Sequence, residues 1–193
     1  MASVDLTAVG IANPVAIDGS VSIAAANPGT PILFLLQEHH ATLATIQENI
    51  DNAQELINTA NVDLIGAESH SADEDIDQLT RINNQPAFAD HFSQQATRIV
   101  GIEYRDVFNH LDQDTSTDAW GGVTVRTHPL NIVRSFAFVG SLFRTRNFDA
   151  LTGNIILNAG GEHVSHIASA PQTVMNIAHT QLSIVCIRPP SYP

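Results

Sequence analysis

The stretch Pro31-Ile-Leu-Phe-Leu-Leu36 decides the fold class, because it is a short continuous apolar run that ends abruptly at Gln37-Glu38-His39-His40. A run of this length without polar alternation is typical of a strand that is buried on both faces of a sheet. The segment that follows repeats apolar residues at helical spacing, namely Leu43, Ile46, Ile50, Ala53 and Ile57. The two segments together predict a buried strand followed by an amphipathic helix.

The same order of strand and helix recurs along the rest of the chain. Further strands are predicted at 62–67, 98–104, 154–157 and 182–187, with a helix expected after 154–157. A helix that begins near Pro86 should bury Phe88 and Phe92. Another that begins at Pro129 has a set of small and apolar residues on or near one side, namely Leu130, Val133, Phe136, Ala137 and Gly140. Strands that alternate with helices predict an α/β fold with a mostly parallel sheet and helices on both faces.

The domain organisation is expected to be simple. Residues 1–30 are apolar but interrupted by proline and glycine, and they predict a lead-in segment with a short hairpin. Residues 31–193 are predicted to form a single α/β domain. Within this domain, Ser71 and Glu74 resemble a capping box for a short acidic helix, and residues 109–122 are expected to be a long polar loop.

Composition excludes several classes of function. The chain has 193 residues, 44% of them hydrophobic and 15% charged, and its formal net charge is −12. This balance predicts a globular, soluble domain, and the acidity argues against binding to nucleic acid or to anionic lipid. No apolar stretch is long enough to span a membrane, and the first ten residues lack the basic region of a secretory signal. We therefore expect a soluble protein, either cytoplasmic or exported without a visible signal peptide.

Lysine is absent, since arginine supplies all 8 basic residues. One interpretation is compositional drift. The other is selection against ubiquitin attachment, as in a protein that acts in a eukaryotic cytosol. The single cysteine, Cys186, excludes an internal disulfide and a cysteine-rich zinc site, and its apolar surroundings predict a buried thiol.

Glutamates and histidines follow the predicted strands. They are Glu38 with His39 and His40, Glu68 with His70, Glu103, and Glu162 with His163. Ligands of parallel α/β sheets bind beyond the carboxyl ends of the strands, so these side chains are expected at one edge. Glutamate and neutral histidine can ligate a transition metal or transfer protons. The alternative is that several of them are ordinary loop residues or helix caps.

Arg134 lies on the helix that begins at Pro129, and its role is open on sequence alone. Its guanidinium is expected to face a carboxylate, either a site glutamate or a substrate oxyanion. The alternative is a solvated helix arginine.

Four short motifs in order resemble those of the superfamily that joins TraB-type and Tiki-type proteins, ChaN-like haem-uptake proteins and erythromycin esterases. They are Gln37-Glu38-His39-His40, Leu64-Ile-Gly-Ala-Glu68, Arg134-Ser-Phe-Ala-Phe138 and Gly160-Gly-Glu-His163. The sequence departs from the family pattern at Gln37, where glycine is usual, and at Phe138, where methionine is usual. The resemblance covers residues 31–165 and implies a site built from Glu38, His40, Glu68 and His163, with His39 as the alternative to His40.

The leading functional hypothesis is a hydrolase of an ester or amide bond in a small-molecule or peptide substrate. A divalent metal (Mn, Co, Fe or Zn) held by Glu38, His40, Glu68 and His163, or a Glu/His pair without metal, would activate water. Glu68 or Glu38 would be the general base, His163 and His40 ligands or acid–base partners, and Arg134 would stabilise the developing charge.

Two alternative functions use the same edge of the sheet. One is a protein that binds haem or a metal without turnover, with His39 or His40 and His163 as candidate ligands. The other is an effector or interaction module with a vestigial site. An exposed apolar lead-in would also favour a homodimer.

Overall fold

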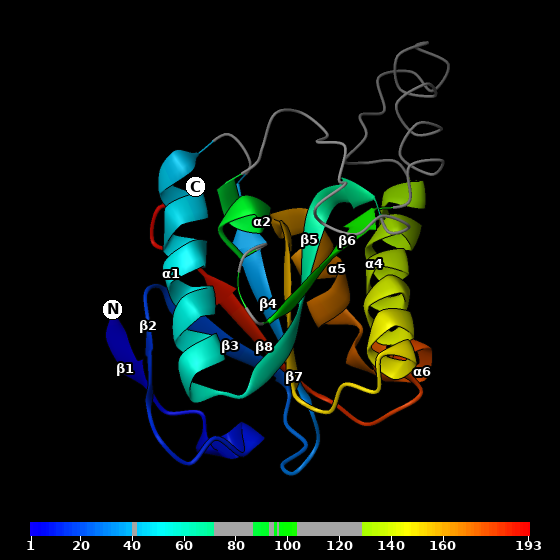
Figure 1. Ribbon diagram of the computed structural model, residues 1–193, viewed down its shortest axis with the longest axis horizontal. Helices are drawn as coiled ribbons and strands as arrows, with labels where there is room; N and C mark the ends of the chain where they lie inside the picture. Colours follow the sequence, from blue (N-terminus) through cyan, green and yellow to red (C-terminus); the bar gives the residue numbers. More distant parts are fainter. Residues whose placement is uncertain (40–41, 72–86, 93–94, 96, 104–128) are drawn as a thin grey trace.

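The computed structural model describes residues 1–39, 42–71, 87–92, 95, 97–103 and 129–193 (Figure 1). Over these residues the chain forms a six-stranded sheet, a separate two-stranded ribbon, and helices that cover both faces of the large sheet. The elements in chain order are β1 (Ala2–Val4), a 3-10 turn η1 (Thr7–Val9), β2 (Val15–Ile17), β3 (Ser20–Ala25), β4 (Ile32–Glu38), α1 (Leu43–Thr59), β5 (Val62–Ser71), α2 (Ala87–Phe92), β6 (Arg98–Glu103), α4 (Pro129–Phe148), β7 (Asn154–Gly160), α5 (Gly161–Ser169), α6 (Pro171–Ala178) and β8 (Ser183–Arg188).

The strands of the large sheet follow the order β3-β8-β4-β7-β5-β6. β8, β4, β7, β5 and β6 are parallel to one another, and only β3 runs antiparallel, beside β8. The predicted α/β class with a mostly parallel sheet and helices on both faces is confirmed. Because five neighbouring strands run the same way, their carboxyl ends lie at one edge of the sheet.

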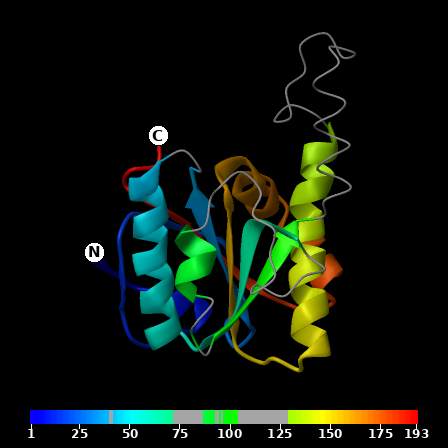
Figure 2. The same ribbon diagram turned by 45° about the horizontal axis from the view of Figure 1, so that its top comes forward.

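Two hydrophobic layers explain the continuous apolar runs of the central strands. In β4, Phe34 and Leu36 pack against α1 and α2, whereas Leu33 and Leu35 pack against α4, α5 and α6. Figures 1 and 2 show these two groups of helices on opposite faces of the sheet. Successive strand residues point to opposite faces, so a strand with helices on both faces needs apolar residues at every position.

The first 30 residues contribute more to the fold than the predicted lead-in segment with a short hairpin. β1 and β2 pair antiparallel as a small ribbon, but β3 joins the large sheet as its edge strand, which the sequence analysis did not predict. The apolar side chains of this segment are buried against α1 and its neighbours, including Leu6, Val9, Ile11, Val15 and Ile17. Met1 and Ile23 of the same segment are exposed, and the homodimer stays a prediction.

Two predicted helix faces need correction. In α1 the buried apolar residues begin at Ile46, and Leu43 at the first position is 80% exposed. In α4 the predicted face does not point to the core, since Val133 is 55% exposed. The buried face instead carries Asn131, Arg134, Ser135, Phe138, Val139, Ser141, Leu142 and Phe143. Apolar residues occur all around this helix, so their spacing alone did not identify the side that faces the sheet.

Of the remaining predicted elements, one helix can be compared with the structure, and another helix and a loop fall mostly or wholly outside the described residues. α2 begins at Ala87 and buries Phe88 and Phe92, as predicted. The helix expected from Ser71 to Leu79 falls almost wholly outside the described residues, and the polar loop 109–122 lies entirely outside them. Among the helices that are described, none has the length and apolar character needed to cross a membrane.

Gly66 in β5 is required by close packing. A Cβ atom at this position would lie 2.5 Å from Cδ2 of Leu142 and 2.8 Å from Cγ2 of Ile102, and both side chains are fully buried. We expect Gly66→Ala to lower the free energy of unfolding by about 1–3 kcal/mol, the usual cost of overpacking. Gly140→Ala in α4 is the control, because its Cβ would meet only Ile177 at 3.7 Å and alanine favours a helix. Denaturant unfolding of both variants tests this, and equal stabilities would contradict it.

Cys186 lies buried in β8, as predicted. Burial raises the pKa of its thiol to about 11, against a smaller lowering by the hydrogen bond with Ser22. Only the thiolate is nucleophilic. At pH ~8, three units below this pKa, about a thousandth of the Cys186 side chains are ionised and able to react. We expect iodoacetamide at pH ~8 to alkylate the folded protein far more slowly than the chain unfolded in guanidinium, where the ordinary cysteine pKa of about 8.5 applies. Equal rates, followed by mass spectrometry, would contradict the buried thiol.

Candidate functional site

The carboxyl ends of four adjacent strands, β4, β7, β5 and β6, bring the candidate residues to one edge of the sheet. Glu38 ends β4 and Glu103 ends β6. Glu68 lies near the carboxyl end of β5, and Gly160 ends β7. Pairing in register places Glu38 opposite Gly160, and the backbone N–H of Gly160 donates to Oε2 of Glu68 at 2.5 Å. The strand order therefore gathers glutamates that are far apart in sequence.

Arg134 is the centre of this arrangement. It projects from the first turns of α4 and donates from Nε to Oε1 of Glu103 at 2.8 Å, while its Nη2 contacts the other oxygen of the same carboxylate. Nη2 also donates to Oε1 of Glu68 at 3.0 Å, and Nη1 lies 2.9 Å from Nε2 of His163. Arg134 is 6% exposed, so the solvated-arginine interpretation is wrong and its carboxylate partners include two site glutamates.

Charge balance explains how this arginine is tolerated in the interior. Burial by itself lowers the pKa of Arg134, but the hydrogen bond with Glu103 and the charges of Glu68 and Glu103 outweigh it, so the pKa is raised. A raised pKa means that the protonated form is the native form, and it stays charged throughout the neutral range. One guanidinium then faces two carboxylates, which leaves an excess of negative charge beside His163.

His163 lies in the first turn of α5 and is 5% exposed. Its Nε2 is 3.3 Å from Oε1 of Glu68, and its Nδ1 is 2.7 Å from Oγ of Ser135. The ring also packs against Phe138, with centroids 4.9 Å apart. Both ring nitrogens therefore meet polar partners, and a carboxylate and an imidazole that can exchange a proton stand side by side.

Glu38 belongs to a second polar group on the other side of β7. The Nδ2 of Asn158 in β7 donates to Oε2 of Glu38, and Oδ1 of Asn158 accepts from Nδ2 of Asn49 in α1 at 2.9 Å. The same Nδ2 of Asn49 contacts the backbone oxygen of Gln37 at 3.0 Å. Since neighbouring strands are about 4.8 Å apart, the backbones of β4 and β5 stand about 10 Å apart at this edge, on either side of β7.

The first motif contributes less to this edge than predicted. His39 is half-buried, its Nδ1 lies 2.7 Å from Oγ1 of Thr42, and its ring meets Tyr192 edge-on at 6.2 Å. Arg134 and its partners Glu68, Glu103 and His163 form what we call the Arg134 cluster. Among the described residues, no contact joins His39 to this cluster. His40 lies outside the described residues, so the register of this motif and both haem-ligand assignments stay predictions.

The predicted metal site has three of its four residues described, namely Glu38, Glu68 and His163. No group of three His, Cys, Asp or Glu side chains within the described ranges is arranged to hold a metal ion. The guanidinium of Arg134 already engages Oε1 of Glu68 and Nε2 of His163, the atoms that a metal would need. The described residues therefore do not by themselves fit a metal ion, and its binding remains a prediction for experiment.

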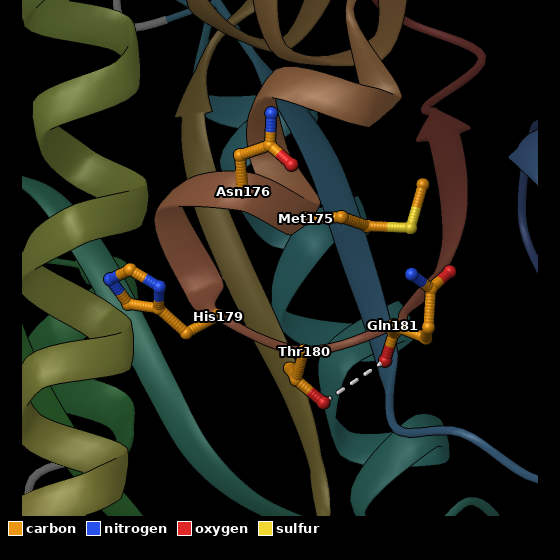
Figure 3. Close-up of a pocket in the computed structure, with 5 residues that line it drawn as sticks. All are labelled: Met175, Asn176, His179, Thr180 and Gln181. Carbon is orange, nitrogen blue, oxygen red and sulfur yellow. Dashed lines mark hydrogen bonds between the residues drawn. The ribbon is translucent and has the colours of Figure 1, made fainter.

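Two cavities lie away from this edge. One of about 610 Å³ is a surface hollow between the end of α6 and the start of β8, lined by Met175, Asn176, His179, Thr180 and Gln181 (Figure 3). The other, of about 320 Å³, is lined by residues that precede the strands, among them Thr30, Asn61 and Gly153. Both lie toward the amino ends of the parallel strands and share no residue with the cluster, so neither supports a role in its chemistry.

Several residues of the two polar groups at this edge were not predicted as site residues from the sequence. Glu103 was noted at a strand end but not assigned to the site, and Ser135, Asn158 and Asn49 were not singled out. All four are buried polar side chains. A signal was present for Ser135, which directly follows Arg134 in the third motif, but nothing in the sequence showed that this face of α4 meets His163.

No protein-family model, curated protein or solved structure matches this chain. The resemblance drawn from the four motifs therefore stays a prediction, and a function for this chain can be inferred only from the geometry of Glu68, Glu103, Arg134 and His163.

Proposed function

We propose that this protein is a hydrolase of an ester or amide bond, with Glu68 and His163 as its proton-transferring pair. The observation that carries the proposal is the 3.3 Å contact between Oε1 of Glu68 and Nε2 of His163, beside the buried guanidinium of Arg134. A carboxylate and an imidazole at this distance can take a proton from water and return it to a leaving group. The carboxyl edge of a parallel sheet is also where such proteins bind small ligands.

Arg134 supports this chemistry through its partners. Its bidentate contact with Glu103 fixes the guanidinium plane, and its Nη2 holds the carboxylate of Glu68 in place from one side while the N–H of Gly160 holds it from the other. A carboxylate with fixed donors on both oxygens has little freedom to turn. In this role the positive charge stabilises the negative charge that develops when hydroxide attacks a carbonyl group.

Glu38 is the second candidate for the general base. Its carboxylate is oriented by Asn158, which is itself held by Asn49. Glu38 and Glu68 come from the two strands on either side of β7, but their partners lie on opposite faces of the sheet: Glu38 is tied through Asn158 to α1, and Glu68 is bound by Arg134 of α4. Separate variants of the two glutamates distinguish the alternatives.

The test is a screen of the purified protein against ester and peptide substrates, beside Glu38→Gln, Glu68→Gln and His163→Ala. Activity that is lost in Glu68→Gln and His163→Ala supports the proposed pair, and loss in Glu38→Gln assigns the base to that residue. Activity unchanged in all three variants would overturn the proposal. Elemental analysis of protein purified without chelator or nickel is run in parallel. A stoichiometric metal that is lost in His163→Ala would make His163 a ligand instead of a proton carrier.

A further inference from the structure

We infer that Ser135 is a positioning residue that fixes His163 as the tautomer protonated on Nδ1, so that Nε2 carries the lone pair. The inference concerns a buried hydroxyl that the proposed reaction does not use directly. Ser135 is fully buried in α4, which removes it from consideration as a nucleophile open to substrate.

The hydrogen bonds of the Ser135 hydroxyl leave one consistent assignment. Its Oγ donates to the backbone oxygen of Asn131 at 2.9 Å, which uses the single hydroxyl hydrogen. Nδ1 of His163 lies 2.7 Å from the same Oγ, and Nδ1 of His166 lies 3.0 Å from it. Since the hydroxyl has no second hydrogen to give, both imidazoles must donate to its lone pairs. Both rings then carry their proton on Nδ1.

The opposite end of the His163 ring leads to the same tautomer. Nε2 lies 2.9 Å from Nη1 of Arg134, and a guanidinium can only donate. A proton on Nε2 would place two donors against each other at this distance. Nε2 also lies 3.3 Å from Oε1 of Glu68, which would accept such a proton. Arg134 and Glu68 therefore favour opposite tautomers, and Ser135 adds the hydrogen bond that decides between them.

The consequence for catalysis rests on the proposed function. The single lone pair of Nε2 accepts from Nη1 of Arg134 in the resting protein, so neutral His163 takes a proton at Nε2 when that hydrogen bond is released, while Ser135 accepts the hydrogen bond from Nδ1 throughout. The inference about the tautomer itself does not depend on any activity, because it concerns the resting protein.

The measurement is a long-range ¹H–¹⁵N correlation spectrum of protein labelled with ¹⁵N in its 9 histidines. It is recorded at increasing pH until the ¹⁵N shifts of the His163 ring no longer change, so that the neutral ring is the form observed. Signals are assigned by their absence from His163→Gln and His166→Gln. We expect His163 to show a protonated Nδ1 and an unprotonated Nε2. In Ser135→Ala the ratio of Nδ1–H to Nε2–H tautomers should fall about tenfold, as loss of one hydrogen bond implies.

Two variants separate positioning from a merely structural role. Ser135→Thr keeps a hydroxyl that can bond the carbonyl four residues earlier, and it should retain the wild-type tautomer. Ser141→Ala removes a buried hydroxyl of the same helix for which the described residues supply no partner, and it should leave the His163 signals unchanged. A wild-type His163 protonated on Nε2, or a Ser135→Ala spectrum identical to wild type, would overturn the inference. Both results can be read whether or not the protein hydrolyses any substrate.

Discussion

Replacing Arg134 by methionine is expected to lower the free energy of unfolding by about 3–5 kcal/mol, the usual cost of removing one partner of a buried ion pair. Methionine fills much of the same volume, so the loss reports charge more than packing. Glu103, which is 1% exposed, loses its bidentate partner, and Glu68 loses one of its donors. Equilibrium unfolding in urea, followed by circular dichroism, measures the change.

The control for this prediction is Arg144→Met on the same helix. Arg144 is exposed, so its replacement should change stability by no more than about 0.5 kcal/mol. The double variant Arg134→Met with Glu103→Leu should recover part of the loss, because it removes the carboxylate left unpaired as well. If Arg134→Met were as stable as Arg144→Met, the cluster would not be held by the guanidinium.

Replacing Glu68 by glutamine is expected to reduce the proposed hydrolysis by about 10²–10⁴-fold, the range for loss of a general acid or base. The amide cannot take a proton from water. Its NH₂ group must also face a donor, since Nη2 of Arg134 approaches one oxygen of Glu68 and the N–H of Gly160 approaches the other. The measurement is kcat and KM on a substrate found in the screen, with the folded fraction of each variant checked by thermal unfolding.

Glu162→Gln is the matched control for Glu68→Gln. Glu162 lies at the same edge, one residue before His163, but its side chain is exposed. Its replacement should leave kcat within a few-fold of wild type. A loss of equal size in both variants would indicate a general effect of negative charge at this edge and would argue against a specific role for Glu68.

The fold class, and the edge of the sheet that carries the candidate residues, could be predicted from the sequence alone. Continuous apolar runs such as 31–36 are explained only by strands covered on both faces, and their alternation with helices requires parallel pairing. Parallel pairing sends every carboxyl end to one edge, so Glu38, Glu68 and His163 were placed there correctly. These conclusions depend on local periodicity and on one rule of chain connection, and both can be read from a linear sequence.

Which of these residues contact one another depends on tertiary packing. α4 carries apolar side chains all around, so helical spacing left its buried face undetermined, and the face that docks on the sheet presents Arg134 and Ser135 to the site. Glu68, Glu103 and His163 contact this arginine because β7, β5 and β6 are adjacent, an order that no local pattern encodes. β3 likewise pairs with β8, although more than 150 residues of chain separate the two strands. Contacts between distant segments depend on how whole elements pack, and that information lies in the fold and not in the spacing of residues along the chain.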